Sequence, residues 1–154
     1  MEDHPHLNGI KRTQAIKPDY VDALYQMDKF YECLKEADIV AACLPNTRDT
    51  VKIFDSKAFE NMKDGAFFIN VGRGNAVDTD ALYEALVSNK LRACALDVTD
   101  PEPLPKEHKL WGAPNILITP HVSGGYHLKE THNRIVNIAA KNIMHMNNGE
   151  AIEN

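Results

Sequence analysis

The chain has 154 residues, 44% of them hydrophobic and 25% charged, which is an ordinary globular composition and argues against a disordered or fibrous protein. This length corresponds to a single domain, so a complete two-domain enzyme is not expected. Acidic residues outnumber basic ones by 22 to 17, and the net charge of −5 argues against a nucleic-acid partner, because such partners usually require a basic face.

Location is predicted from the apolar runs, the first residues and the cysteines. No run approaches the roughly 20 apolar residues that span a bilayer, and the acidic start Met1-Glu2-Asp3-His4 is unlike a signal peptide. Cys33, Cys43 and Cys94 are odd in number and widely spaced. Cys43 and Cys94 stand within apolar runs, which favours free, buried thiols. We therefore predict a cytoplasmic protein with no membrane partner.

Short hydrophobic runs alternate with helix-like segments from residue 28 onward. This alternation predicts parallel β-strands covered by helices. Strands are expected at residues 39–44, 66–71, 93–98 and 116–119. Because these runs are continuously apolar, the pattern favours strands buried on both faces, as in a doubly wound α/β sheet. Residues 1–9 and 151–154 are interpreted as tails, and residues 10–150 as the domain.

Three helices are predicted: one before the first strand, one between the second and third strands, and one after the last. Asp28 is expected to cap a first helix, whose apolar face carries Phe30, Cys33, Leu34 and Ala37. Asp78-Thr79-Asp80 offers acceptors and negative charge to a second helix, with Leu82, Ala85 and Leu86 on one face. Apolar residues at helical spacing over residues 128–148 predict a long C-terminal helix that ends at Asn147-Asn148-Gly149.

Polar residues suited to catalysis follow three of the expected strands. Arg73, within Gly72-Arg73-Gly74, is a planar cation suited to binding a carboxylate, although a solvated turn arginine is the alternative. Glu102 stands between Pro101 and Pro103, and on its own would be an exposed loop acid. His121 can exchange a proton near neutral pH, although most loop histidines have no such role.

Taken together, Arg73, Glu102 and His121 indicate a catalytic site. Strand ends in a parallel sheet meet at one edge, and ligands of open α/β sheets bind there. The arginine would orient a substrate carboxylate, and the histidine would pass a proton to or from a carbonyl or hydroxyl oxygen. The glutamate would keep the imidazole protonated and oriented.

Residues 10 to 150 resemble the D-isomer-specific 2-hydroxyacid dehydrogenases, in particular their glyoxylate and hydroxypyruvate reductase branch. The resemblance rests on four segments in order: Ala37 to Thr47, Phe68-Ile69-Asn70-Val71-Gly72-Arg73-Gly74, Ala95-Leu96-Asp97-Val98 with Pro101 to Pro105, and Thr119-Pro120-His121. It implies an oxidoreductase that transfers a hydride between NAD(P)H and a small 2-oxo or 2-hydroxy acid.

The resemblance also implies roles for individual residues. Arg73 would bind the carboxylate and carbonyl of the 2-oxo acid, His121 would be the general acid/base, and Glu102 its partner. The residues implied to line the dinucleotide are Leu44, Pro45, Val71, Gly72, Asp97 and Gly124, with Asp97 near the carboxamide.

The chain departs from the family pattern at its beginning. The family's G-x-G-x-x-G phosphate loop is absent, and Gly72 to Val77 lacks the third glycine. Ile10-Lys11-Arg12-Thr13 is interpreted as the end of the family's second strand. The expected fold is therefore a partial Rossmann-like sheet that lacks its first strand and glycine loop. A basic residue at this strand end accommodates the 2′-phosphate of NADP, so Arg12 favours NADP over NAD, unless the arginine simply faces water.

The sequence leaves two other functions open and bears on the partners of the chain. A dinucleotide-sensing binding protein on the same scaffold, or a catalytically incomplete fragment, are the alternatives to an enzyme. Open strand edges left by the missing strand predict a homodimer. No metal is expected, because neither His121, His127 and His132 nor His4 and His6 are completed by cysteine or carboxylate at zinc-site spacing.

Overall fold

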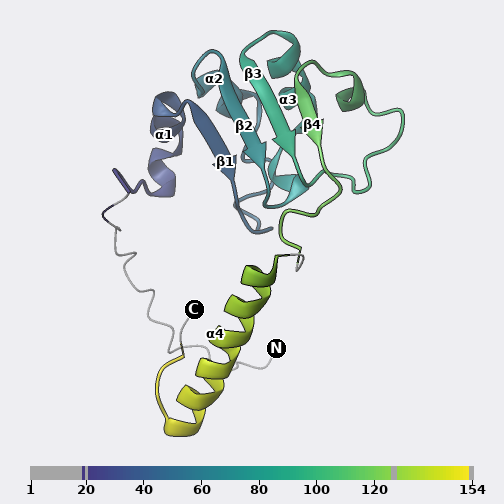
Figure 1. Ribbon diagram of the computed structural model, residues 1–154. Helices are drawn as coiled ribbons and strands as arrows, with labels where there is room; N and C mark the ends of the chain where they lie inside the picture. The colour runs from purple at the N-terminus through teal and green to yellow at the C-terminus, as the bar shows by residue number, and fades with distance from the viewer. Residues whose placement is uncertain (1–18, 20, 126–127, 153–154) are drawn as a thin grey trace, which may run out of the picture.

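The computed structural model describes residues 19, 21–125 and 128–152. Helices and strands alternate along the chain (Figure 1). The elements are η2 (Met27–Lys29), α1 (Phe30–Glu36), β1 (Ile39–Ala42), α2 (Ser56–Asn61), β2 (Ala66–Asn70), η3 (Gly74–Ala76), α3 (Thr79–Val87), β3 (Leu91–Leu96), η4 (Lys109–Gly112), β4 (Ile116–Ile118) and α4 (Lys129–Asn148).

The four strands form one parallel sheet in the order β1-β2-β3-β4. This confirms the predicted parallel α/β architecture and the place of each strand, with boundaries that differ by a few residues. The largest difference is at β3, which begins at Leu91 rather than residue 93, because Leu91 already pairs with Ala66 of β2. All four strands therefore end at the same edge of the sheet.

All three predicted helices are present, as α1, α3 and α4, but the predicted cap of the first one is wrong. Asp78 caps α3 as predicted, and its side chain accepts hydrogen bonds from the backbone amides of Asp80 and Ala81. The long C-terminal helix is present as α4 and ends at Gly149, whose φ of 71° suits a glycine cap. Asp28 does not cap α1, because it lies inside a turn of 3-10 helix, η2, and Lys29 takes the cap position before Phe30.

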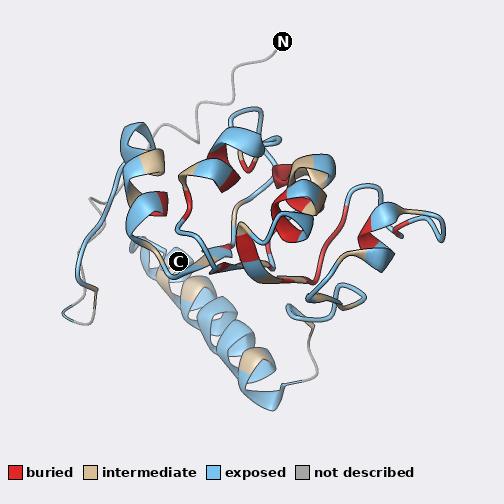
Figure 2. Cartoon of the chain, turned by 90° about the horizontal axis from the view of Figure 1, so that it is seen from above, coloured by how far each residue is buried: buried red, intermediate tan, exposed pale blue. Residues whose placement is uncertain are grey.

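The core lies between the sheet and helices α1, α2 and α3, where the buried residues gather in Figure 2. Phe54, Phe59 and Phe68 form its aromatic centre, with ring centroids 4.9 to 6.5 Å apart. Leu82 and Leu86 of α3 are also buried there, as their helical spacing predicted. The core thus joins three helices to one face of the sheet.

The opposite face of the sheet is uncovered, which corrects the expectation that the strands are buried on both faces. Ile39, Phe67 and Leu117 are 61%, 40% and 62% exposed on β1, β2 and β4. The physical reason is the strand order. The strands follow one another without a reversal, so the right-handed crossovers place all their helices on one side.

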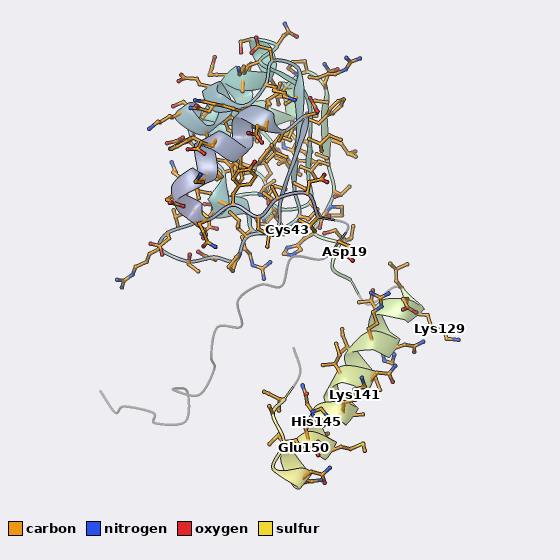
Figure 3. The ribbon with its side chains drawn as sticks, turned by 90° about the vertical axis from the view of Figure 1, so that its left-hand side faces the viewer. Asp19, Cys43, Lys129, Lys141, His145 and Glu150 are labelled. Carbon is orange, nitrogen blue, oxygen red and sulfur yellow. The ribbon has the colours of Figure 1, made fainter. Side chains whose placement is uncertain are left out.

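Helix α4 extends away from the sheet, and none of its residues is buried (Figures 1 and 3). Ile135, Ile143 and Met146 on its apolar face are 45%, 61% and 71% exposed. No helix in the described part of the chain is both long and apolar enough to cross a membrane.

The three cysteines are free, but only one is buried as predicted for its run. Cys94 lies in the core, and burial raises the pKa of its thiol to about 12. Cys43 is exposed rather than buried, because it follows the last residue of β1, where the chain leaves the sheet.

Candidate active site

The carboxyl edge of the sheet carries the predicted site residues. Leu44 follows β1, Arg73 follows β2, Asp97 follows β3 and His121 comes shortly after β4. Figure 1 shows this edge at the arrowheads of the strands, on the side from which α4 departs. Cys43 marks the same edge in Figure 3.

Glu102 and His121 are brought into direct contact. His121 Nδ1 lies 2.8 Å from Glu102 Oε1, and the two side chains are 46% and 42% exposed. A carboxylate at this distance favours a proton on Nδ1, which leaves Nε2 as the nitrogen that can exchange a proton with a ligand. The geometry therefore suits a histidine that works as an acid or base.

Arg73 lies on the same edge but forms no hydrogen bond or ion pair with His121 or Glu102. Its Nη1 donates to the Gly72 carbonyl oxygen at 2.7 Å, and its side chain is exposed. No carboxylate among the described residues forms an ion pair with Arg73. Its other guanidinium N–H groups therefore remain available to a ligand carboxylate, which arginine binds in a bidentate manner.

The backbone of the turn that carries Arg73 is held by hydrogen bonds from a buried side chain, while the arginine side chain itself is exposed. Asn70 is fully buried; its amide donates to the Arg73 carbonyl oxygen at 2.9 Å and its Oδ1 accepts from the Gly72 amide at 3.0 Å. A Cβ on Gly72 would lie 2.6 Å from the backbone nitrogen of Leu44, and one on Gly74 would collide with the carbonyl group of Thr99. The two glycines thus permit close backbone packing.

Asn70 was missed by the sequence analysis, although a signal for it exists. It is a polar residue that ends an otherwise apolar strand, and a buried amide there must find hydrogen-bond partners. The turn after the strand supplies them.

Asp97 forms the most extensive polar cluster of the edge. Its Oδ1 accepts from the Thr119 hydroxyl at 2.6 Å and from the Val122 amide at 2.9 Å, and its Oδ2 accepts from the Ser123 amide at 2.8 Å. Burial by itself would raise the pKa of this carboxyl group. The hydrogen bonds from Ser123, Thr119 and the backbone amides outweigh burial and hold the pKa of Asp97 well below its usual range.

A cleft of about 560 Å³ opens beside these residues. Its polar lining includes Asp97, Glu102 and Thr119, and its apolar lining includes Leu104 and Trp111. The Trp111 indole nitrogen donates to the Pro105 carbonyl oxygen at 2.8 Å, which fixes the ring at the rim. The cleft combines apolar walls with a few polar groups, as small-molecule sites commonly do.

The remaining cofactor-site residues fall at the same edge where the structure describes them. Pro45, Val71 and Gly124 are exposed there, whereas Gly72 is buried. Arg12 lies outside the described residues, as do His4, His6 and His127. Within the part of the chain that the structure describes, no group of three or more His, Cys, Asp or Glu side chains is arranged to hold a metal ion.

Comparisons with known proteins identify the family. The family model for the D-isomer specific 2-hydroxyacid dehydrogenase, NAD binding domain, matches residues 6–123. Glyoxylate/hydroxypyruvate reductase A of Citrobacter koseri is 37% identical over 119 residues, which cover 77% of this chain and 37% of that protein. The Homo sapiens glyoxylate reductase/hydroxypyruvate reductase is 38% identical over 113 residues, which cover 73% of this chain and 34% of that protein.

Comparison with solved structures points to the same family. The crystal structure of a D-isomer specific 2-hydroxyacid dehydrogenase from Xanthobacter autotrophicus Py2, in complex with NADPH and MES, is similar with a TM-score of 0.74. It is 31% identical, and the similarity covers 89% of this chain and 56% of that one. Among the curated relatives compared, the chain spans between 34% and 45% of their length. The chain belongs to the family of D-isomer specific 2-hydroxyacid dehydrogenase NAD-binding domains.

Proposed function

We propose that this chain is the NAD(P)-binding part of a dehydrogenase that interconverts a small 2-oxo acid, such as glyoxylate or hydroxypyruvate, and its 2-hydroxy acid. The observation that carries this proposal is the 2.8 Å contact between His121 and Glu102 at the edge that also carries Arg73. The relatives named glyoxylate and hydroxypyruvate reductases support the same substrate class.

The roles of the residues follow from their chemistry. Arg73 binds the substrate carboxylate through the N–H groups of its guanidinium, which the turn presents at the edge. His121 donates a proton from Nε2 to the carbonyl oxygen during reduction, and Glu102 stabilises the imidazolium through Nδ1. A bound nicotinamide dinucleotide supplies or accepts the hydride.

The residues at the edge fit the nicotinamide end of a dinucleotide. Asp97 Oδ2 accepts a hydrogen bond from the Ser123 amide, and because a carboxylate has about four acceptor sites, Asp97 would also accept an amide N–H of the cofactor. Leu44, Pro45, Val71, Gly72 and Gly124 would complete this end of the site. Arg12 would bind the 2′-phosphate of NADP, which favours NADP over NAD.

Titration of the chain with NADPH and NADH, followed by nicotinamide fluorescence, tests this proposal. We expect saturable binding of both, with NADPH at least about tenfold tighter because a hydrogen-bonded phosphate–arginine pair adds that much. An Arg12→Ala variant should lose the preference for NADPH and keep its affinity for NADH.

The outcomes distinguish the three candidate functions. Saturable binding with hydride transfer to glyoxylate supports the dehydrogenase. Binding of a dinucleotide without hydride transfer to any 2-oxo acid would instead favour the sensing role. A failure to bind either dinucleotide would overturn the proposal in favour of a catalytically incomplete fragment, since helix N-termini and glycine-loop amides normally hold the pyrophosphate.

We also propose that two copies of the chain form a homodimer. Among the described residues, β1 and β4 each pair on one side only, and the uncovered sheet face exposes Ile39, Phe67 and Leu117. Unpaired edges and apolar patches favour association. Light scattering should give twice the chain mass, and Phe67→Ser should lower it. Val87→Ser, on exposed α3 surface, is the matched control. A monomeric mass for the unmodified chain would contradict the dimer.

The cytoplasmic location remains a proposal supported by three free thiols, which are usual in reducing compartments. Cell fractionation of the tagged chain tests it, and recovery in a secreted fraction would contradict it.

A further inference from the structure

The segment that carries His121 is attached on both sides to one buried carboxylate. Two residues before His121, the Thr119 hydroxyl donates to Asp97 at 2.6 Å. Directly after it, the amides of Val122 and Ser123 donate to Asp97 at 2.9 and 2.8 Å. Asp97 is 5% exposed, so little water competes for these three bonds. Asp97 therefore holds the chain on both sides of the histidine, two residues before it and directly after it.

The backbone of His121 needs this attachment. Its φ is 55°, in the left-handed region that side-chain-bearing residues rarely adopt. The one further bond within the segment is that from the His121 amide to the Thr119 carbonyl oxygen, at 3.0 Å. Such a conformation persists only where the surroundings impose it. The three donors to Asp97 belong to these surroundings, together with the Thr119 amide, which donates to the Leu96 carbonyl oxygen at 2.9 Å.

The orientation of the His121 side chain depends in turn on this backbone conformation. His121 is nearly half exposed, and its described polar partner is Glu102, which comes from the separate loop after β3. Because nearly half of the side chain is exposed, the direction of the imidazole depends on the position of its own backbone and on that one hydrogen bond.

We infer that Thr119 and Asp97 are positioning residues that hold the His121 imidazole against Glu102. The inference rests on the proposed function, in which His121 is the acid/base group. Asp97 would thus position His121 in addition to contacting the cofactor, and Thr119 would do so through its hydroxyl group. A hydrogen bond to a charged group changes a local equilibrium by about tenfold or more, so the loss of the hydroxyl should be measurable.

The test uses NMR on the chain itself, without substrate or cofactor. Thr119→Val removes the hydroxyl and keeps the shape, and Thr119→Ser restores the hydroxyl. Ser88→Ala is the matched control, because it removes a hydroxyl that donates at 2.7 Å to the Glu84 carbonyl oxygen on α3, away from the site. Two signals are followed: hydrogen exchange of the Val122 and Ser123 amides, and the long-range ¹H–¹⁵N signals of the His121 imidazole.

The expected result is specific to the position of the ring. In Thr119→Val, exchange at Val122 and Ser123 should rise about tenfold or more, and the His121 signals should lose the signature of an Nδ1–H shared with a carboxylate. Thr119→Ser should restore both, and Ser88→Ala should change neither. Exchange of the β2 amides reports whether the fold is intact. If valine disturbs the packing, Thr119→Ala removes the same hydroxyl group with a smaller side chain.

Two results would overturn the inference. If exchange rises but the His121 signals are unchanged, Asp97 and Thr119 stabilise the loop without positioning the ring. If neither changes, the hydroxyl has no positioning effect. Failure of the proposed function would appear separately, as absent dinucleotide binding or hydride transfer, because the NMR experiment needs neither.

Discussion

On the proposed function, replacing His121 with glutamine is expected to lower the turnover number for reduction of glyoxylate by about 10²- to 10⁴-fold, the usual contribution of a positioned acid or base. Glutamine keeps a polar side chain of similar length but cannot donate a proton as an imidazolium does. NADPH oxidation, followed by absorbance with glyoxylate as substrate, measures the effect. Binding of NADPH should change little, because the loss falls on proton transfer.

The matched control is His132→Gln, on the exposed surface of α4. It should leave both turnover and binding unchanged. Equal losses from the two substitutions would show that the histidine at the strand edge has no special role, and would remove the basis of the proposed acid/base pair.

The second large effect concerns stability. Gly74→Ala is expected to lower the free energy of unfolding by about 1–3 kcal/mol, because overpacking at a rigid contact displaces the backbone. The added methyl group would collide with the Thr99 carbonyl group and lie 2.8 Å from the Asp100 backbone nitrogen. These are backbone atoms, which cannot turn aside as a flexible side chain can. Urea unfolding followed by circular dichroism measures the change.

Gly112→Ala provides the control for this prediction. It stands in η4, and a Cβ there would meet no atom within 4 Å. Alanine should therefore leave the stability unchanged or raise it slightly, since it reduces the freedom of the unfolded chain. A Gly74→Ala variant as stable as Gly112→Ala would contradict the close packing of the turn against Thr99.

Local patterns in the sequence were sufficient for most of the secondary structure. The continuous apolar runs predicted all four strands, and Asp78 with Leu82 and Leu86 predicted α3 and its buried face. These features depend on residues close together in the chain. The cap at Asp28 was wrong because an additional turn of 3-10 helix shifts the helix start, and nothing in the short-range pattern distinguishes the two.

Local patterns did not predict that helices cover only one face of the sheet. An apolar run shows that a strand avoids water, but Phe67 and Leu117 are exposed because every crossover returns on the other face. Cys43 shows the same limit: its apolar neighbours indicated burial, and its position just past β1 exposes it.

For the candidate site, the sequence by itself determined which chemical groups are present and at which strand ends they stand: Arg73, Glu102 and His121 follow successive runs, and parallel strands bring such ends to one edge. Only the tertiary structure decided which of them touch. It joined His121 to Glu102, gave Arg73 no hydrogen bond to that pair, and gathered the donors of residues 119–123 around Asp97. The reason is that a hydrogen bond between two loops forms or fails with a difference of a few tenths of an ångström in the distance between donor and acceptor. Chain order sets the edge to which a loop belongs, and packing sets its position there.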